Sequence, residues 1–187
     1  KYKGKKILFC ASRLAGEKGI QYVIKAMKYL DNNYILLIAG WGSYEKELKK
    51  LSSELDLQKK VIFLGKIEHK DIFTYYKLAK LFCHFPTIFE SFGRTIIESM
   101  AVGTPVLAYP IAGIKDIIQD GKNGFLLESR DPKKIAEKIK KINNENLKNI
   151  STYAIKYVKD NYSNEIIGKK ILSVYKNEFS NNNTNVG

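Results

Sequence analysis

The sequence predicts an α/β domain: a Rossmann-like, doubly wound parallel sheet of about six strands, followed by C-terminal helices. Short apolar runs alternate along the chain with segments of helical periodicity. The runs are apolar almost throughout, as is typical of strands that helices cover on both faces. The chain has 187 residues, 44% of them hydrophobic, which is enough for one well-packed core.

The expected strands are apolar runs bounded by polar or turn residues. They lie over 7–11, 34–39, 61–64, 81–85, 105–109 and 124–127. Apolar residues that recur every three or four positions predict amphipathic helices. These cover 17–30, 44–57, 69–79, 94–102, 113–119 and 132–143, then 146–159 and 163–178. Repeated strand–helix units of this kind form parallel sheets. We expect one domain over 1–179 and a disordered tail over 180–187.

The chain is strongly basic. Its 32 Lys and Arg residues against 19 Asp and Glu give a formal net charge of +13. This favours anionic partners, which include nucleic acid, an acidic membrane surface and phosphorylated small molecules. The lysines are spread along the chain, and it contains neither a zinc-finger spacing nor an aromatic-basic RNA-binding motif. Specific nucleic-acid recognition is therefore not expected.

The sequence also bears on compartment. No apolar run is long enough to cross a bilayer, and the first residues do not form a signal peptide. Cys10 and Cys83 lie in apolar runs without the spacing of metal ligands, which favours buried, reduced thiols and no metal site. We therefore expect a cytoplasmic protein. Because the sequence does not begin with Met, we also expect it to be a fragment of a longer protein.

Ligands of doubly wound sheets bind beyond the carboxyl ends of the strands. The loops there are expected at 12–18, 40–43, 65–68 and 86–94. In the last of them, Phe92 and Gly93 lead directly into a helix that begins near Arg94 and Thr95. The N-terminus of a helix presents free N–H groups and the positive end of the helix dipole. This loop is therefore a candidate phosphate site.

Two carboxylates, Glu90 and Glu98, flank this helix start. Ionised carboxylates only accept hydrogen bonds, so they suit hydroxyl groups. A ligand with hydroxyls on both sides of a diphosphate, such as a nucleotide sugar, matches this layout. Arg13 and Lys18, in the first loop, could neutralise the diphosphate. The alternative is that Glu90 caps the helix and Glu98 is merely exposed, and that both cations are solvated surface residues.

The other loops carry weaker signals. The Gly-x-Gly turn of AGWGSYEKEL (39–48) has Glu45 at the third glycine position of the dinucleotide fingerprint and follows the second strand, so NAD binding is not expected. Trp41 could lie at a pocket rim. Lys66 and Ile67, after the third strand, could contact a base. His84 is expected to be a partly buried structural residue.

Five segments carry a resemblance to a known family. They are ASRLAGEKGIQYVIKAM, LLIAGWGSYEKEL, VIFLGKI, PTIFESFGRTIIESMAVGTPVLAYPIAG and DGKNGFLLESRDPKKIAEKI. In this order and at these spacings they resemble the C-terminal, donor-binding half of a GT-B glycosyltransferase, and in particular the retaining glycosyltransferase family 4. Ser12 stands where the family usually has Gly, and Ala112 where it usually has the first residue of a Gly-Gly pair. The resemblance therefore does not specify the donor.

The resemblance implies roles for the candidate residues. Arg13 and Lys18 would bind the donor diphosphate, and Glu90 would contact the transferred sugar near the reacting carbon; these three form the catalytic set. Glu98 would hold the ribose hydroxyls. The remaining donor contacts would come from the backbone groups of Phe92, Gly93, Arg94 and Thr95 around the phosphate and sugar, and from Lys66 and Ile67 near the base.

The resemblance also implies a reaction. The enzyme would transfer a hexose from a nucleoside-diphosphate sugar to a glycan or lipid-linked acceptor, as in polysaccharide biosynthesis, with retention of configuration and without a metal or other cofactor. The acceptor would bind an N-terminal domain that this chain lacks, so the isolated domain is expected to be inactive alone. Because the chain is basic, peripheral association with the inner membrane surface is expected.

Three alternatives stay open. The first is a basic, Rossmann-like nucleic-acid-binding module. The second is a nucleotide-sugar-modifying enzyme of another class, such as an epimerase, although an intact glycine fingerprint at the first strand is missing. The third is a catalytically silent relative.

Overall fold

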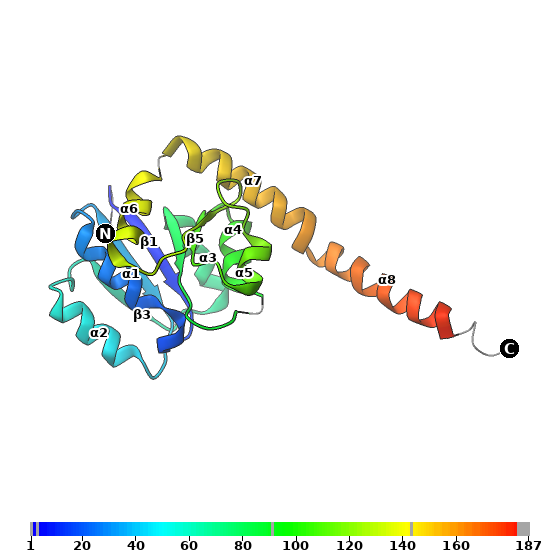
Figure 1. The fold of residues 1–187 in the computed structure, drawn as a ribbon, viewed down its shortest axis with the longest axis horizontal. Helices are drawn as coiled ribbons and strands as arrows, with labels where there is room; N and C mark the ends of the chain where they lie inside the picture. Colours follow the sequence, from blue (N-terminus) through cyan, green and yellow to red (C-terminus); the bar gives the residue numbers. More distant parts are fainter. Residues whose placement is uncertain (1, 3, 91, 143, 183–187) are drawn as a thin grey trace.

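The computed structural model describes residues 2, 4–90, 92–142 and 144–182. The described strands form one parallel sheet with the order β3-β2-β1-β4-β5-β6 (Figure 1). They are β1 (Lys6–Ala11), β2 (Tyr34–Ala39), β3 (Val61–Gly65), β4 (Leu81–His84), β5 (Val106–Ala108) and β6 (Phe125–Leu126). The predicted fold class and all six predicted strands are confirmed. Each strand is apolar because helices cover both faces of the sheet.

The helices follow the strands in the expected alternation. They are α1 (Ile20–Ala26), α2 (Glu45–Glu54), α3 (His69–Leu78), α4 (Arg94–Ala101), α5 (Ala112–Ile117), α6 (Pro132–Lys141), α7 (Asn144–Tyr162) and α8 (Asn164–Asn182). The start of α6 shows how the local sequence sets a boundary. Asp131 accepts hydrogen bonds from the N–H groups of Lys133 and Lys134, and Pro132 takes the first helical position.

Two apolar clusters hold the layers together. One face of the sheet packs Leu8, Cys10 and Leu36 against α1, α2 and α6. The other face packs Phe9 and Leu37 against α3, α4 and α5. Helix α7 contributes to both clusters, and Figure 1 shows it running across the end of the domain. The result is a sheet between two helical layers, which leaves the loops at the carboxyl ends of the strands free to form a site.

The prediction of one helix over 17–30 is wrong in detail. The segment forms a 3-10 turn, η1 (Gly16–Lys18), then α1, then a second 3-10 turn, η2 (Met27–Tyr29). The break falls at Gly19, which adopts a left-handed conformation with φ of 71°. A Cβ atom at this position would overlap with the carbonyl of Phe85. The close approach of this distant loop, which the local periodicity does not reveal, therefore accounts for the glycine that separates η1 from α1.

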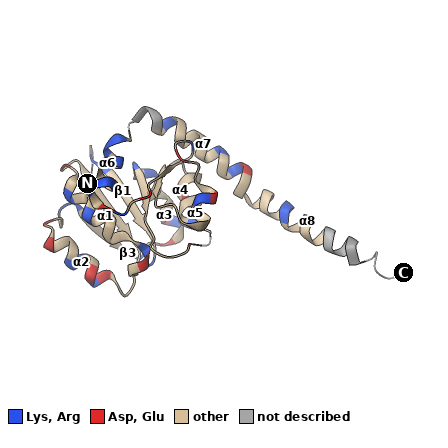
Figure 2. Cartoon of the chain, in the orientation of Figure 1, with Lys and Arg blue, Asp and Glu red and all other residues tan. Residues whose placement is uncertain are grey.

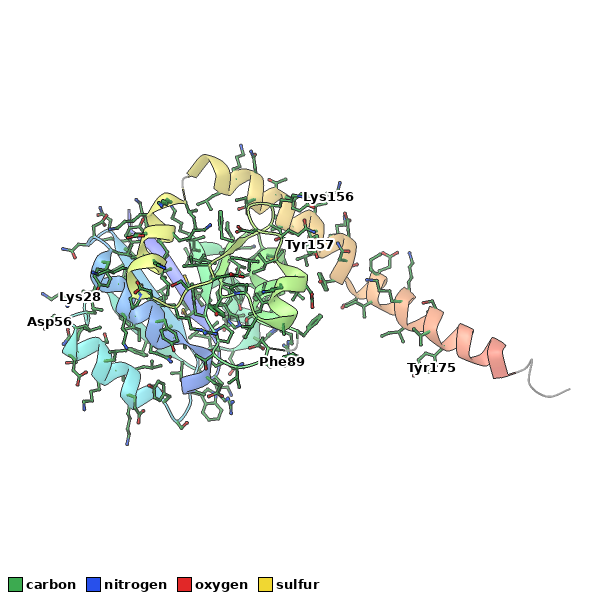
Figure 3. All side chains as sticks on the ribbon, viewed as in Figure 1. Lys28, Asp56, Phe89, Lys156, Tyr157 and Tyr175 are labelled. Atoms are coloured by element: carbon green, nitrogen blue, oxygen red, sulfur yellow. The ribbon has the colours of Figure 1, made fainter. Side chains whose placement is uncertain are left out.

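Helix α8 extends away from the rest of the domain (Figure 1). Its exposed apolar side chains include Ile171, Leu172, Val174 and Tyr175. Figure 3 shows Tyr175 projecting from the helix clear of the sheet and its covering helices. Within the described residues, no helix is both long and apolar enough to span a membrane. Of the predicted tail over 180–187, residues 180–182 belong to α8, and 183–187 lie outside the described residues.

Candidate functional site

The site lies where the strand order reverses. The two central strands are β1 and β4, and the chain continues from them toward opposite edges of the sheet. The loops that leave these two strands therefore diverge and open a crevice at their carboxyl ends. Two adjoining depressions occupy this crevice, each of about 360 Å³. They share Ser12 and Arg13 from the loop after β1, and Thr95 from the first turn of α4.

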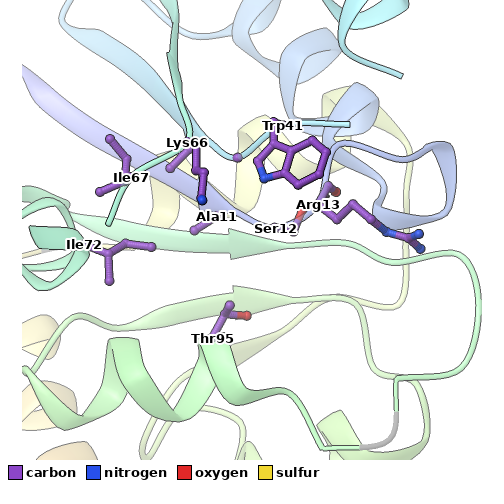
Figure 4. A pocket seen from close by; sticks show the side chains of 10 residues that line it. Ala11, Ser12, Arg13, Trp41, Lys66, Ile67, Ile72 and Thr95 are labelled. Carbon is purple, nitrogen blue, oxygen red and sulfur yellow. Dashed lines mark hydrogen bonds between the residues drawn. The ribbon is translucent and has the colours of Figure 1, made fainter. Parts of the chain in front are cut away.

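The first depression, shown in Figure 4, is mainly apolar. Its walls come from the ends of β1 and β2, from the segment after β3 and from α3. The side chain of Trp41 is exposed and forms part of the wall, as expected for a rim residue. Lys66, Ile67 and Ile72 line the same space. A flat aromatic ring with one basic neighbour suits a heteroaromatic group, which can stack on it.

The second depression is charged. It is lined by Ser12, Arg13, Lys18, His84, Glu90, Arg94 and Thr95. Lys18 Nζ lies 2.8 Å from Glu90 Oε2, and His84 Nε2 lies 3.6 Å from the same oxygen. The sequence analysis placed Lys18 and Glu90 on different groups of a ligand, whereas the structure pairs them with each other. Arg13, the other predicted cation, lies 2.6 Å from Glu17.

Glu90 is the acid most affected by its surroundings. The side chain is 20% exposed. The His84 ring and then Lys18 lower the pKa of Glu90 to about 2, although burial acts in the opposite direction. Glu90 is therefore ionised at neutral pH and can only accept hydrogen bonds. It pairs with Lys18, and the N-cap position of α4 is taken by Gly93 without a side-chain cap.

The N-terminus of α4 separates the two depressions. Gly93 adopts φ of 63° and turns the loop into the helix. Helix geometry leaves the N–H groups of Arg94 and Thr95 without carbonyl partners inside the helix. Thr95 lines both depressions. An anion held at this helix end would therefore have the apolar depression on one side and Glu90 on the other. The Phe92 ring meets the Tyr162 ring edge-on, with centroids 5.9 Å apart.

Glu98 is not simply exposed. Its side chain is 18% exposed, and its carboxylate has three partners. His69 Nε2 lies 3.2 Å from Oε1, the Tyr76 hydroxyl donates to Oε2 at 3.2 Å, and an Arg94 guanidinium nitrogen lies 3.5 Å from Oε1. The sequence analysis missed His69 and Tyr76 as partners. The positions of both residues on α3 gave no local signal, because the contact depends on how α3 packs against α4.

A second group of missed residues holds the loop after β4. Arg130 donates through Nε and a terminal nitrogen to the carbonyl oxygen of Pro86. Its guanidinium lies over the Tyr109 ring, 3.5 Å from the ring centroid. On the opposite side, the Thr87 N–H donates to the carbonyl of Glu17 at 2.8 Å. These contacts fix the start of the segment that carries Glu90.

No metal cluster is formed by the described residues: nowhere among them do three or more His, Cys, Asp or Glu side chains converge. The basic residues are distributed over helices on both sides of the sheet (Figure 2). The net charge therefore does not by itself mark the crevice as a basic site.

The fold and the crevice define a Rossmann-like α/β protein with its candidate ligand site at the switch point of the sheet. Residues 1–161 match the family described as Glycosyl transferases group 1, and the chain belongs to this family.

Two curated relatives illustrate the match. The uncharacterized glycosyltransferase MJ1607 of Methanocaldococcus jannaschii is 34% identical over 175 residues, which are 91% of this chain and 45% of the relative. The capsular polysaccharide biosynthesis glycosyltransferase CapM of Staphylococcus aureus is 32% identical over 169 residues, 87% of this chain and 44% of that protein. The chain thus spans about half the length of these relatives.

Solved structures agree with the fold. Anabaena Alr3699/HepE in complex with UDP and glucose superposes with a TM-score of 0.88 at 25% identity, over 94% of this chain and 49% of the other. The C-terminal domain of the group 1 glycosyl transferase LpcC from Francisella tularensis gives a TM-score of 0.77 at 24% identity, over 86% of this chain and 88% of that domain. The assignment to a GT-B glycosyltransferase domain is therefore confirmed.

Proposed function

We propose that the chain is the donor-binding half of a retaining glycosyltransferase of family 4, and that it binds a nucleoside-diphosphate sugar. The observation that carries the proposal is the meeting of an apolar and a charged depression at one helix N-terminus, with Thr95 lining both. A nucleotide sugar has the same order of parts: an aromatic base, a ribose, a diphosphate and a second sugar.

The proposed pose follows this order. The base lies against Trp41 and Ile67 in the first depression, near Lys66. The ribose hydroxyls donate to Glu98, which lines neither depression but follows Thr95 by three residues in α4. The diphosphate accepts hydrogen bonds from the backbone N–H groups at the start of α4, and the transferred sugar lies beside Glu90 in the second depression.

Arg13 and Lys18 neutralise the diphosphate in this pose, so both must exchange partners. In the free protein Arg13 pairs with Glu17 and Lys18 with Glu90. The Arg13 side chain is 69% exposed, and an ion pair so accessible to solvent contributes little to stability. Both cations line the charged depression, where they would meet the diphosphate.

We propose uridine as the base. Alr3699/HepE has been crystallised with UDP and with UDP-glucose, and a TarM variant of Staphylococcus aureus with UDP. TarM is 26% identical to this chain, and the match covers 94% of this chain. The apolar depression, at about 360 Å³, has room for a nucleotide base.

We propose a whole protein of about twice this length, with an acceptor-binding N-terminal domain, because the chain spans about half of its relatives. The isolated chain should then turn over little. The exposed apolar side chains of α8 are available for contact with that domain. Relatives include CapM and the alpha-monoglucosyldiacylglycerol synthase of Streptococcus pneumoniae, which support transfer of a hexose to a glycan or lipid-linked acceptor. The basic composition supports a cytoplasmic location at the inner membrane surface.

The test is a calorimetric titration of the chain with UDP, GDP and ADP. We expect saturable binding of UDP and weaker binding of the two purine nucleotides. An Arg13→Ala/Lys18→Ala double variant should bind UDP at least about tenfold more weakly, because each cation supplies a charge-assisted contact to the diphosphate. A Lys25→Ala/Lys28→Ala double variant removes the same charge at a separate depression and serves as the matched control.

The outcomes discriminate between functions. Equal losses in both double variants would mean that the basic surface acts as a whole. Tight duplex-DNA binding with a steep salt dependence would favour the nucleic-acid alternative. Failure of all three nucleotides to bind would contradict donor binding by this half. Retention is tested on the whole protein, where the anomeric configuration of the product is read by proton NMR; an inverted product would refute it.

A further inference from the structure

His84 is a buried polar residue at the charged depression without a role in the proposed pose. It ends β4, is 6% exposed, and stacks on Phe82 with ring centroids 6.1 Å apart. Its Nε2 atom is buried and has no hydrogen-bond partner among the described residues. A buried imidazole nitrogen without a partner is unfavourable. In the ligand-free protein, His84 Nε2 is therefore available to form a hydrogen bond beside Glu90.

Two nitrogen atoms compete for one oxygen of Glu90. Lys18 Nζ holds Oε2 at 2.8 Å, while His84 Nε2 stands 3.6 Å from the same atom. An N–H···O hydrogen bond needs about 2.7–3.2 Å, so the His84 contact must shorten by about 0.4–0.9 Å. A small rotation of the carboxylate suffices for this, but Lys18 holds the oxygen where it is.

The other charged groups of the depression do not offer Glu90 a replacement. Arg13 and Arg94 line the same space, but their side chains are 69% and 75% exposed, and each pairs with a different carboxylate, Glu17 or Glu98. If Lys18 leaves, the buried neighbour that remains at Oε2 is therefore His84.

We propose that His84 is a positioning residue for Glu90, which replaces Lys18 as the hydrogen-bond donor to Oε2 when Lys18 turns to the donor diphosphate. The exchange rests on the proposed function, because the diphosphate is what draws Lys18 away. Because of this exchange, the partly buried Glu90 carboxylate still has a partner after Lys18 has turned away. The exchange also keeps Glu90 ionised and directed at the transferred sugar. The His84 backbone is fixed in β4, where its carbonyl oxygen accepts a hydrogen bond from the Tyr109 N–H.

The experiment uses NMR of the imidazole nitrogens. The chain has only two histidines, His69 and His84, so a His69→Gln variant assigns both sets of signals. In the free protein, Lys18→Met removes the competing cation without any ligand. We expect the His84 Nε2 resonance to take a chemical shift typical of a hydrogen-bonded N–H, because this nitrogen can then donate to Glu90 Oε2.

A Lys18→Met/Glu90→Leu double variant separates the two causes of such a change in chemical shift, because leucine cannot accept a hydrogen bond. If Lys18 acts only through its charge, the change persists in the double variant. If His84 bonds to Glu90, most of the change disappears. Lys28→Met alters a residue at a separate depression and should leave His84 unchanged. A change that persists without the Glu90 carboxylate would overturn the proposal.

Saturation of the unchanged chain with UDP and then with UDP-glucose tests the exchange itself. Both ligands should shift the His84 Nε2 resonance in the same direction as Lys18→Met, and the shift should vanish in Glu90→Leu, which has no acceptor. Binding without any response of His84 would overturn the positioning role and leave the donor-binding function intact. Absence of binding would remove the trigger and overturn both.

Discussion

Tyr76→Phe offers a clean test of how the site is built, because it removes one oxygen atom and nothing else. The Tyr76 ring is fully buried and meets Phe9 and Phe82 edge-on, each with centroids 5.2 Å apart. Phenylalanine keeps both contacts. The lost hydroxyl donates to Glu98 Oε2 at 3.2 Å. Burial, followed by the neighbouring Glu98 charge, raises the pKa of Tyr76, so the phenol keeps its proton and remains a donor.

The magnitude follows from this one hydrogen bond. A hydrogen bond to a charged group contributes about 1.5–3 kcal/mol. At 3.2 Å it is longer than the usual range for O–H···O, so the lower end applies. Glu98 also keeps His69 and Arg94, and phenylalanine has no hydroxyl to desolvate. We expect a net loss of about 0.5–1.5 kcal/mol, or about 1–6 °C in Tm for a domain of this size.

The assay combines urea unfolding with UDP titration. If Oε2 is held by Tyr76 so that the carboxylate meets the ribose, UDP affinity should fall about threefold to tenfold, which corresponds to about 0.7–1.4 kcal/mol. Tyr75→Phe is the matched control, because no protein partner for its hydroxyl is found among the described residues and its ring stacks on Phe9.

Two results would refute this reasoning. If Tyr76→Phe were as stable as Tyr75→Phe and bound UDP equally well, the hydroxyl would contribute nothing to Glu98. If stability fell by more than about 3 kcal/mol, the ring itself must have moved, since one hydrogen bond cannot supply that loss.

Three further predictions concern stability. Gly19→Ala should lower the free energy of unfolding by more than about 4 kcal/mol or prevent folding, because its Cβ would overlap with the Phe85 carbonyl. Gly121 has φ of 75° but open space around it, so Gly121→Ala should lower the free energy of unfolding by only about 1–2 kcal/mol, as measured by circular dichroism melts. The Glu90 pKa falls from 4.5 to about 2 on folding, so the stability that Glu90 contributes is present above about pH 4.5 and is lost as the pH falls toward 2. After a discount for solvent screening, the stability advantage of the unchanged chain over Glu90→Gln should shrink by about 1–2 kcal/mol between pH 6 and pH 2.5 in urea titrations. Asp131→Ala should lower the free energy of unfolding by about 1 kcal/mol, since it removes the N-cap of α6, and a change below about 0.3 kcal/mol would contradict that role.

Much of the fold follows from local pattern. The strand expected over 81–85 is β4 (Leu81–His84), and the apolar run over 34–39 is β2 without any shift. Such runs are informative because both faces of the sheet are covered, so neither face needs polar residues. The start of α6 can also be predicted from the local sequence, because Asp131 and Pro132 act on the backbone next to them.

The parts that local pattern could not give depend on contacts between distant segments. The break at Gly19 arises from the Phe85 carbonyl, which belongs to the loop after another strand. The link from Arg130 to the Pro86 carbonyl joins segments on either side of β5. Residue types and spacing predicted which segments would meet at the crevice, but not which side chains would bond there.

The pairing of side chains alters what the charge of the chain means for its site. Within the crevice three cations already have a carboxylate neighbour: Arg13 with Glu17, Lys18 with Glu90, and Arg94 with Glu98. Lys66 also lines the crevice, in its apolar depression. Most of the formal charge of +13 therefore resides on the rest of the surface. A ligand that binds this crevice has to exchange ion pairs instead of filling a vacant basic site, and the net gain per contact is smaller than for an unpaired cation. Selectivity must then come from groups that can satisfy the carboxylates released by the exchange. Hydroxyl groups on both sides of a diphosphate do this, and a bare polyphosphate or a nucleic-acid backbone without such hydroxyls does not.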